Sequence, residues 1–170
     1  MPYPRELETT EQLHDGTVMH LRPIRPDDAT VARRFLESVS PEDIRARFHG
    51  AMRDFGGPLL IRLTQIDYDR EIALIGLRDG DELPLGVVRL YTEPDHISGE
   101  FAILVRSDLH HHGLGTILIH RIIAIARDRG LKRIVGSVLR DNTRMLRLVR
   151  EFGFVAENAR GDEVTMVLGL

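Results

Sequence analysis

Apolar and polar residues alternate along this chain with two periods, one typical of strands and one typical of helices. Short apolar runs bounded by glycine, proline or aspartate predict strands. The predicted strands cover residues 18–22, 71–77, 84–91, 100–105, 133–139, 154–155 and 164–168. Short turns at 79–81 and 94–96 join three of these strands in succession, which favours an antiparallel arrangement.

Helical spacing and capping residues predict five helices between these strands. Apolar residues recur at helical intervals within 116–129, and Gly130 ends that helix. Ser40 caps a helix that starts at Pro41 and reaches about Phe48. The other predicted helices open at 26–28, cover 59–65 and begin after Asp141-Asn142. This order of elements predicts an α/β (α+β) domain with a mixed, mostly antiparallel sheet flanked by helices.

Composition narrows the class of protein. The 170 residues are 42% hydrophobic and 29% charged, which suits one globular domain at 13–170 after a flexible arm at 1–12. A net charge of -3 gives no reason to expect nucleic acid or a membrane as a partner. The chain has no cysteine, which excludes disulfides and a thiolate nucleophile. No signal or membrane-spanning segment is evident, so we expect a cytoplasmic protein.

The segment after residue 105 carries the clearest chemical signal. A strand end is followed by a polar loop with Gly113 and Gly115, and then by a helix start. Unpaired N–H groups and the positive end of the helix dipole favour an anion there, and glycines let the main chain approach it. Leu118 stands where a dinucleotide-binding fingerprint needs a third glycine. A generic strand–turn–helix connection stays open as the alternative.

Further motifs give the chain a recognisable pattern. The loop reads His110-His111-His112-Gly113-Leu114-Gly115, and Asn142 opens a helix that closes with Gly153-Phe154. With these motifs the chain resembles the GCN5-related N-acetyltransferase (GNAT) family, and within it the Pat-like protein lysine acetyltransferases that act on acyl-CoA synthetases. The likeness to that subgroup covers the chain from about residue 13 and rests on 15–17, 21–24, Arg47-Phe48, 65–71 and 100–105.

The resemblance implies a GNAT fold in which two central strands splay apart at the acetyl-CoA site. The pyrophosphate would lie on N–H groups of the glycine loop, and the pantetheine arm would pair with the end of strand 100–105. The residues that it assigns to acetyl-CoA are Ile103, Leu104, Val105, His110, His111, His112, Gly113, Leu114, Gly115, Thr116 and Asn142. Asn142 also suits a helix cap, and the two roles are compatible.

Glu100 is the candidate catalytic base. A lysine side chain has a pKa of ~10.4, so the enzyme must remove a proton before the amine can attack a thioester. Glu100 heads an otherwise apolar strand, where burial would raise its pKa, and the resemblance puts the family's catalytic glutamate there. From the residues alone, a glutamate at a strand edge on the surface is the alternative.

The chain departs from the family at several positions. Val149 stands where many relatives carry a tyrosine that protonates the leaving thiolate, which leaves Tyr68 and Tyr91 as other candidate donors. His49 stands where the family usually has a second aromatic residue. Three adjacent histidines cannot easily face one ion, so we expect no metal.

We therefore expect an acetyl-CoA-dependent transferase that acetylates a lysine of a protein, with an AMP-forming acyl-CoA synthetase as the favoured partner. Arg47 and Phe48 would contact the substrate, the alternative being a solvated helix face with Phe48 in the core. An enzyme for a small amine would share the same cofactor site, and a closed pocket instead of an open groove near Arg47 would favour it. A non-catalytic acyl-CoA-sensing module is the third hypothesis, which an exposed or salt-bridged Glu100 would favour.

Overall fold

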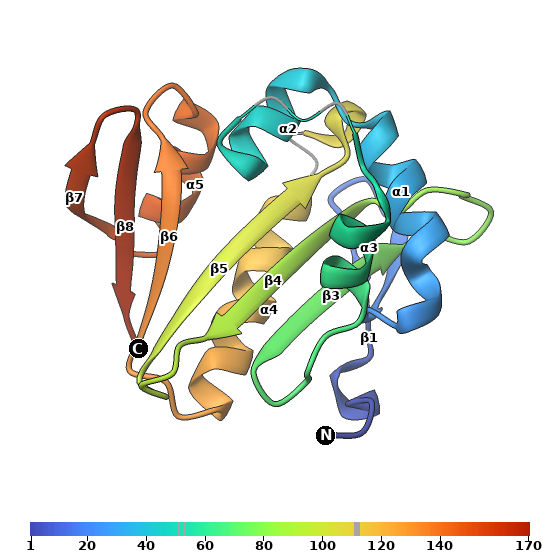
Figure 1. The fold of residues 1–170 in the computed structure, drawn as a ribbon, viewed down its shortest axis with the longest axis horizontal. Coiled ribbons are helices and arrows are strands. Elements are labelled where there is room, and N and C mark those ends of the chain that lie inside the picture. Colours follow the sequence, from blue (N-terminus) through green and yellow to red (C-terminus); the bar gives the residue numbers. More distant parts are fainter. Residues whose placement is uncertain (51, 53, 111–112) are drawn as a thin grey trace.

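One eight-stranded sheet runs through the molecule in the order β1-β2-β3-β4-β5-β6-β8-β7 (Figure 1). The structure is a computed structural model that describes residues 1–50, 52, 54–110 and 113–170. The strands are β1 (Thr9–Gln12), β2 (Val18–Pro23), β3 (Glu71–Leu77), β4 (Gly86–Thr92), β5 (Ser98–Val105), β6 (Arg133–Leu139), β7 (Val155–Arg160) and β8 (Glu163–Gly169). Neighbouring strands are antiparallel except β5 and β6, which run parallel, so the predicted mixed sheet is confirmed.

Helices cover both faces of this sheet. The α-helices are α1 (Ala29–Ser38), α2 (Pro41–Phe48), α3 (Gly57–Thr64), α4 (Leu114–Asp128) and α5 (Thr143–Glu151). Short 3-10 turns are η1 (Arg5–Leu7), η2 (Pro26–Asp28) and η3 (Ser107–Leu109). Figure 1 shows α1, α2 and α3 on one face of the sheet and α4 on the other. No helix in the described ranges has the length and apolar character needed to cross a bilayer.

Two apolar layers form because successive strand side chains point to opposite faces of the sheet. Val88 and Val105 belong to the layer that α4 covers, whereas Leu104 packs on the other face with residues of α1, α2 and α3. Ile119 and Ile122 of α4 are fully buried against the first layer. The apolar residues whose helical spacing predicted α4 are therefore the residues that α4 buries against the sheet.

Most predicted elements are found with small shifts at their ends, but β7 extends to Arg160 where a strand at 154–155 was predicted, and the expectation for the N-terminal segment was wrong. Strands 71–77 and 133–139 have the predicted bounds, and α4 begins two residues earlier than expected. The segment at 1–12 is not a loose arm throughout, because η1 is followed by β1, which pairs with β2 at the sheet edge. The residues of β1 are polar since neither of its faces is buried, so no apolar alternation marked it.

Candidate active site

β5 and β6 diverge within the sheet, and the candidate site lies in the opening (Figure 1). They pair only from Ser98 to Glu100 on β5, after which β5 stays bonded to β4 while β6 stays bonded to β8. Just beyond the last pair, the Phe101 ring packs against Gly136 of β6, where a Cβ atom would collide with the ring. Phe101 thus occupies the space where the strands part. Beyond Glu100, β5 has no β6 partner among the described residues, which leaves an edge for a ligand.

A cavity of about 510 Å³ occupies this opening. The candidate site residues that line it are Arg47, Phe48, Glu100, Ile103, Leu104, Val105, His110, Gly113, Gly115, Thr116 and Asn142. The Leu114 side chain is instead buried in the core, so only its main chain can serve the site. His111 and His112 lie outside the described residues. Segments far apart in the sequence, from α2, β5, α4 and α5, therefore meet around one cavity.

Glu100 is the last β5 residue paired with β6, and its side chain faces the cavity. The residue is exposed to solvent, yet the surrounding protein partly buries the carboxyl group and raises its pKa. Nearby Glu93 raises this pKa further, while Arg47 and His49 oppose the rise without cancelling it. Glu100 forms no ion pair with another described residue. A carboxylate with a raised pKa and an open path to solvent suits proton abstraction.

The N-terminus of α4 presents main-chain donors to the cavity. Gly113 lies at the N-cap with φ at 80°, a left-handed conformation that favours glycine. A Cβ atom there would also lie 2.6 Å from the His14 ring. No side chain in the described part of the chain caps this helix. Its first-turn N–H groups are thus available to an anion, which is the geometry that a phosphate requires.

Asn142 is the N-cap of α5, as expected. Its side-chain oxygen Oδ1 accepts a hydrogen bond of 3.2 Å from the main-chain N–H of Met145. Its main-chain groups also bond within the protein, to Leu139 and Leu146. A contact to a ligand in the cavity would therefore fall to the side-chain Nδ2 group, so capping and ligand binding use different atoms of one amide.

Residues 36–154 match the family model described as the acetyltransferase (GNAT) family. The chain belongs to this family. An acetyltransferase of Pseudomonas aeruginosa is 28% identical over 159 residues, which cover 92% of this chain and 86% of that protein. The protein is thus an acetyltransferase of the GNAT type.

Solved structures agree with this assignment. The GNAT domain of S. lividans PAT superposes with a TM-score of 0.92 and 26% identity, and the match covers 99% of each chain. The spermidine N-acetyltransferase from Vibrio cholerae, solved in complex with CoA and spermine, has a TM-score of 0.71 at 21% identity. That match covers 89% of this chain and 95% of that chain, and it shows likeness of fold alone. The predicted GNAT fold is confirmed.

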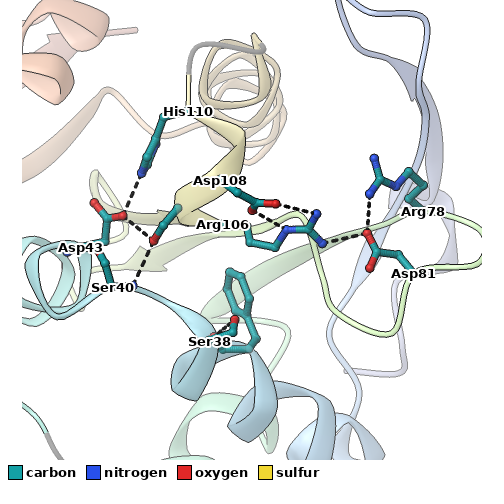
Figure 2. Close-up of polar contacts among 10 residues, drawn as sticks. Ser38, Ser40, Asp43, Arg78, Asp81, Arg106, Asp108 and His110 are labelled. Carbon is teal, nitrogen blue, oxygen red and sulfur yellow. Dashed lines mark hydrogen bonds and ion pairs between the residues drawn. The ribbon is translucent and has the colours of Figure 1, made fainter.

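Asp43, which the sequence analysis did not single out, connects three parts of this GNAT site. Its carboxylate accepts a hydrogen bond from His110 at 2.8 Å (Figure 2) and one from Ser107 at 2.7 Å, and both residues lie on the segment before α4. Arg144 of α5 donates to the other carboxylate oxygen at 3.2 Å. Burial alone would raise the pKa of Asp43, but the bonds from His110 and Ser107 outweigh it and lower the pKa. Asp43 therefore ties α2 to both the glycine loop and α5.

We expect Asp43→Asn to lower the free energy of unfolding at pH 7 by roughly 1–3 kcal/mol, because it removes the charge from a network of partly buried bonds. Urea unfolding would measure this loss. Because folding lowers the pKa of Asp43, its stabilising effect is present above the unfolded-state pKa and is lost as pH falls through the folded-state pKa. The difference between wild type and variant should therefore shrink in acid.

The control is Asp108→Asn, since Asp108 also bonds an arginine, Arg106 (Figure 2), but is largely exposed to solvent. The Asp108 side chain is 64% exposed, compared with 12% for Asp43. We expect Asp108→Asn to cost less than about 1 kcal/mol. Equal losses in the two variants would show that Asp43 is an ordinary surface contact.

Arg47 does not lie on a solvated helix face, which was the alternative to a substrate contact of Arg47 and Phe48. The guanidinium of Arg47 stacks over the Phe48 ring at 4.6 Å, and burial together with nearby Arg89 lowers its pKa. Phe48 packs at the margin of the apolar layer formed with α1 and α3. On the same helix, the partly exposed Arg45 pairs with exposed Asp141 at 2.9 Å. A contact of Arg47 and Phe48 with the substrate stays a prediction.

The position of the family's tyrosine offers no proton donor in this chain, because Val149 is completely buried. Tyr68 is directed elsewhere, since its hydroxyl donates to the main-chain oxygen of Ile24 at 2.8 Å. The cavity wall contains His49 instead, with Nδ1 2.7 Å from Glu163. Glu163 was missed from the sequence because it follows a polar turn and carries no motif. At His49 the sequence carries one signal, which is that the family usually has an aromatic residue at this position.

Proposed function

We propose that this acetyltransferase moves the acetyl group of acetyl-CoA to the side-chain amine of a lysine on a folded protein. An AMP-forming acyl-CoA synthetase is the favoured partner class. The observation that carries this proposal is the likeness to the GNAT domain of S. lividans PAT over 99% of both chains. The exposure of Glu100 supports it, because a lysine on a large partner can reach this residue without entering a tunnel.

The cavity offers a group for each part of the reaction. Main-chain N–H groups at the start of α4 would hold the pyrophosphate, and the free edge of β5 with the Nδ2 group of Asn142 would hold the pantetheine arm. Glu100 would accept a proton from the lysine ammonium, directly or through water. The neutral amine would then attack the thioester carbon, so that a C–N bond forms, the C–S bond breaks and CoA leaves as a thiolate.

A small polyamine is a less favourable acceptor for this cavity. Three carboxylates line its described part, and two of them, Asp43 and Glu163, already bond histidine, serine or arginine donors. Only Glu100 is then left to attract a cation. The exposure of Glu100 is the feature expected of an acyl-CoA-sensing module, but its raised pKa and the membership of an acetyltransferase family favour catalysis.

The test is a competition between acceptors. Purified protein and labelled acetyl-CoA would be incubated with a panel of AMP-forming acyl-CoA synthetases and, separately, with spermidine and free lysine. We expect mass spectrometry to find one dominant acetylated lysine on a synthetase, absent when the Glu100→Gln variant replaces the wild type. Rapid acetylation of the free amines without labelling of protein would favour the small-amine alternative.

A further inference from the structure

His49, Glu163 and Ser137 form a hydrogen-bonded chain in the wall of the cavity that contains Glu100. Nδ1 of His49 lies 2.7 Å from Oε1 of Glu163, and the Ser137 hydroxyl donates to Oε2 at 2.9 Å. His49 follows the last residue of α2, whereas Glu163 begins β8, so the contact crosses the opening between the two parts of the sheet. Because both oxygens of Glu163 are bonded, the carboxylate and the imidazole ring are each held in one orientation.

This arrangement assigns different tasks to the two ring nitrogens of His49. Nδ1 faces a carboxylate and therefore carries the proton that it donates. Nε2 has no hydrogen-bond partner in the described part of the chain, so it is left for a group in the cavity. The bond from His49 lowers the pKa of Glu163, which keeps this carboxylate ionised. When the ring carries a proton on both nitrogens, Nδ1 stays bonded to Glu163 and Nε2 can donate its proton into the cavity.

The backbone of His49 also has a conformation that ordinary helix ends avoid for large residues. Its φ is 56° and its ψ is 33°, in the left-handed region, where glycine or asparagine fits best. This conformation costs a residue with a Cβ atom about 1 kcal/mol.

The charged groups around His49 come from three elements. Glu163 lies on β8, Arg47 lies on α2, and Glu100 on β5 is close enough for the charge of His49 to affect it. A proton acceptor and a proton donor are thus present in the same cavity. These are the two kinds of group that can assist acyl transfer from a thioester to an amine.

We propose that His49, oriented by Glu163 and Ser137, is the general acid that protonates the CoA thiolate in this enzyme. The inference rests on the proposed use of this cavity for acetyl transfer. Glu100 takes a proton from the attacking ammonium, the C–N bond forms, and the C–S bond breaks. The sulfur receives the proton from Nε2 of His49, which becomes neutral. The second proton of the amine nitrogen leaves to solvent. Glu100 then releases its proton to solvent and His49 takes one proton from solvent, so the net products are the amide, the CoA thiol and one proton.

The decisive variant is His49→Asn. The amide nitrogen of asparagine takes the place of Nδ1, so the bond to Glu163 is kept, and asparagine tolerates the left-handed backbone. Only the position of Nε2 is lost. We expect kcat with acetyl-CoA to fall by about 100-fold, at the lower end for a general acid because a thiolate is a fair leaving group. Calorimetry should find the affinity for acetyl-CoA unchanged.

A second acyl donor separates proton donation from a structural role. In acetyl-seleno-CoA, selenium replaces the sulfur, and the selenolate is a weaker base that leaves without a proton. Most of the loss in His49→Asn should disappear with this donor. The Glu163→Gln variant should lose part of the wild-type kcat with acetyl-CoA. Most of this loss should also disappear with acetyl-seleno-CoA. Each assay would use whichever acceptor, protein or free amine, the labelling experiment identifies.

The matched control is His20→Asn. His20 also lies beside a carboxylate, with Nε2 3.5 Å from Asp79, but it is on β2 and does not line the cavity. This variant should keep the wild-type rate with both donors. Full activity of His49→Asn, an equal loss with both donors, or weakened acetyl-CoA binding would each overturn the proposal. If the wild type transferred no acetyl group to any acceptor, the proposed function would fail and this inference would fall with it.

Discussion

Glu100→Gln is expected to reduce turnover by about 100- to 10,000-fold while acetyl-CoA affinity stays nearly unchanged. Glutamine keeps the shape and polarity of the side chain but cannot accept the proton that the lysine ammonium must lose. Initial rates would measure the loss in turnover, and calorimetry would measure the affinity. An equal loss of both quantities would mean that Glu100 supports the structure of the site, and full activity would remove it from the mechanism.

The raised pKa of Glu100 adds a prediction about stability that separates catalysis from folding. Burial and nearby Glu93 disfavour the ionised carboxyl group in the folded state. A carboxyl group whose folded-state pKa is raised stabilises the protein below its unfolded-state pKa, and this contribution is lost as pH rises through the folded-state pKa. At pH 7 the ionised Glu100 therefore opposes folding. Glu100→Gln should unfold at a temperature equal to or above that of the wild type.

Glu93→Gln is the matched control, because it removes a neighbouring carboxylate without removing the base. Without the charge of Glu93 the pKa of Glu100 should fall. The rising part of the pH–rate profile should therefore move to lower pH, while the maximal rate stays close to that of the wild type. A profile that does not move would show that Glu100 is not the group that titrates in it.

Features that depend on neighbouring residues in the sequence were the ones that could be predicted. The bounds of β3 and β6, the cap at Asn142 and the glycine loop before α4 all follow from apolar spacing, capping chemistry or turn residues within a few positions. The splay of β5 from β6 came from the family resemblance alone. The contact of the Phe101 ring with Gly136, beside the point where the strands diverge, joins two strands that no local pattern relates.

The polar network around the cavity could not be predicted for the same reason. Asp43 and His110 lie 67 residues apart in the sequence, and His49 and Glu163 lie 114 residues apart. Within its own helix, Asp43 is an acid in the first turn, where the helix dipole alone explains it. Only the fold, by bringing α2 across the opening, gives these side chains partners. A single sequence thus identifies the glycine loop more readily than the polar residues that the fold gathers around the cavity.

Gly115→Glu is expected to weaken acetyl-CoA binding by roughly 100- to 1000-fold. Gly115 lies in the first turn of α4 and lines the cavity, so a glutamate there would face the phosphates that the loop is proposed to hold. Two like charges about 4 Å apart near a protein surface repel by about 4 kcal/mol, which corresponds to about 1000-fold in Kd. Calorimetry with acetyl-CoA would measure this change.

Two further variants separate charge from crowding and from helix propensity. A Cβ atom at Gly115 would lie 3.0 Å from the end of the Leu148 side chain, which can move aside, so Gly115→Ala should fold and lose much less affinity. Gly57 is the first residue of α3, where a Cβ atom would meet nothing within 4 Å, so Gly57→Glu should bind acetyl-CoA normally. Near-normal affinity in a folded Gly115→Glu protein would exclude this loop from the acetyl-CoA site. Equal losses in the alanine and glutamate variants would show that space, and not a bound phosphate charge, requires glycine at this position.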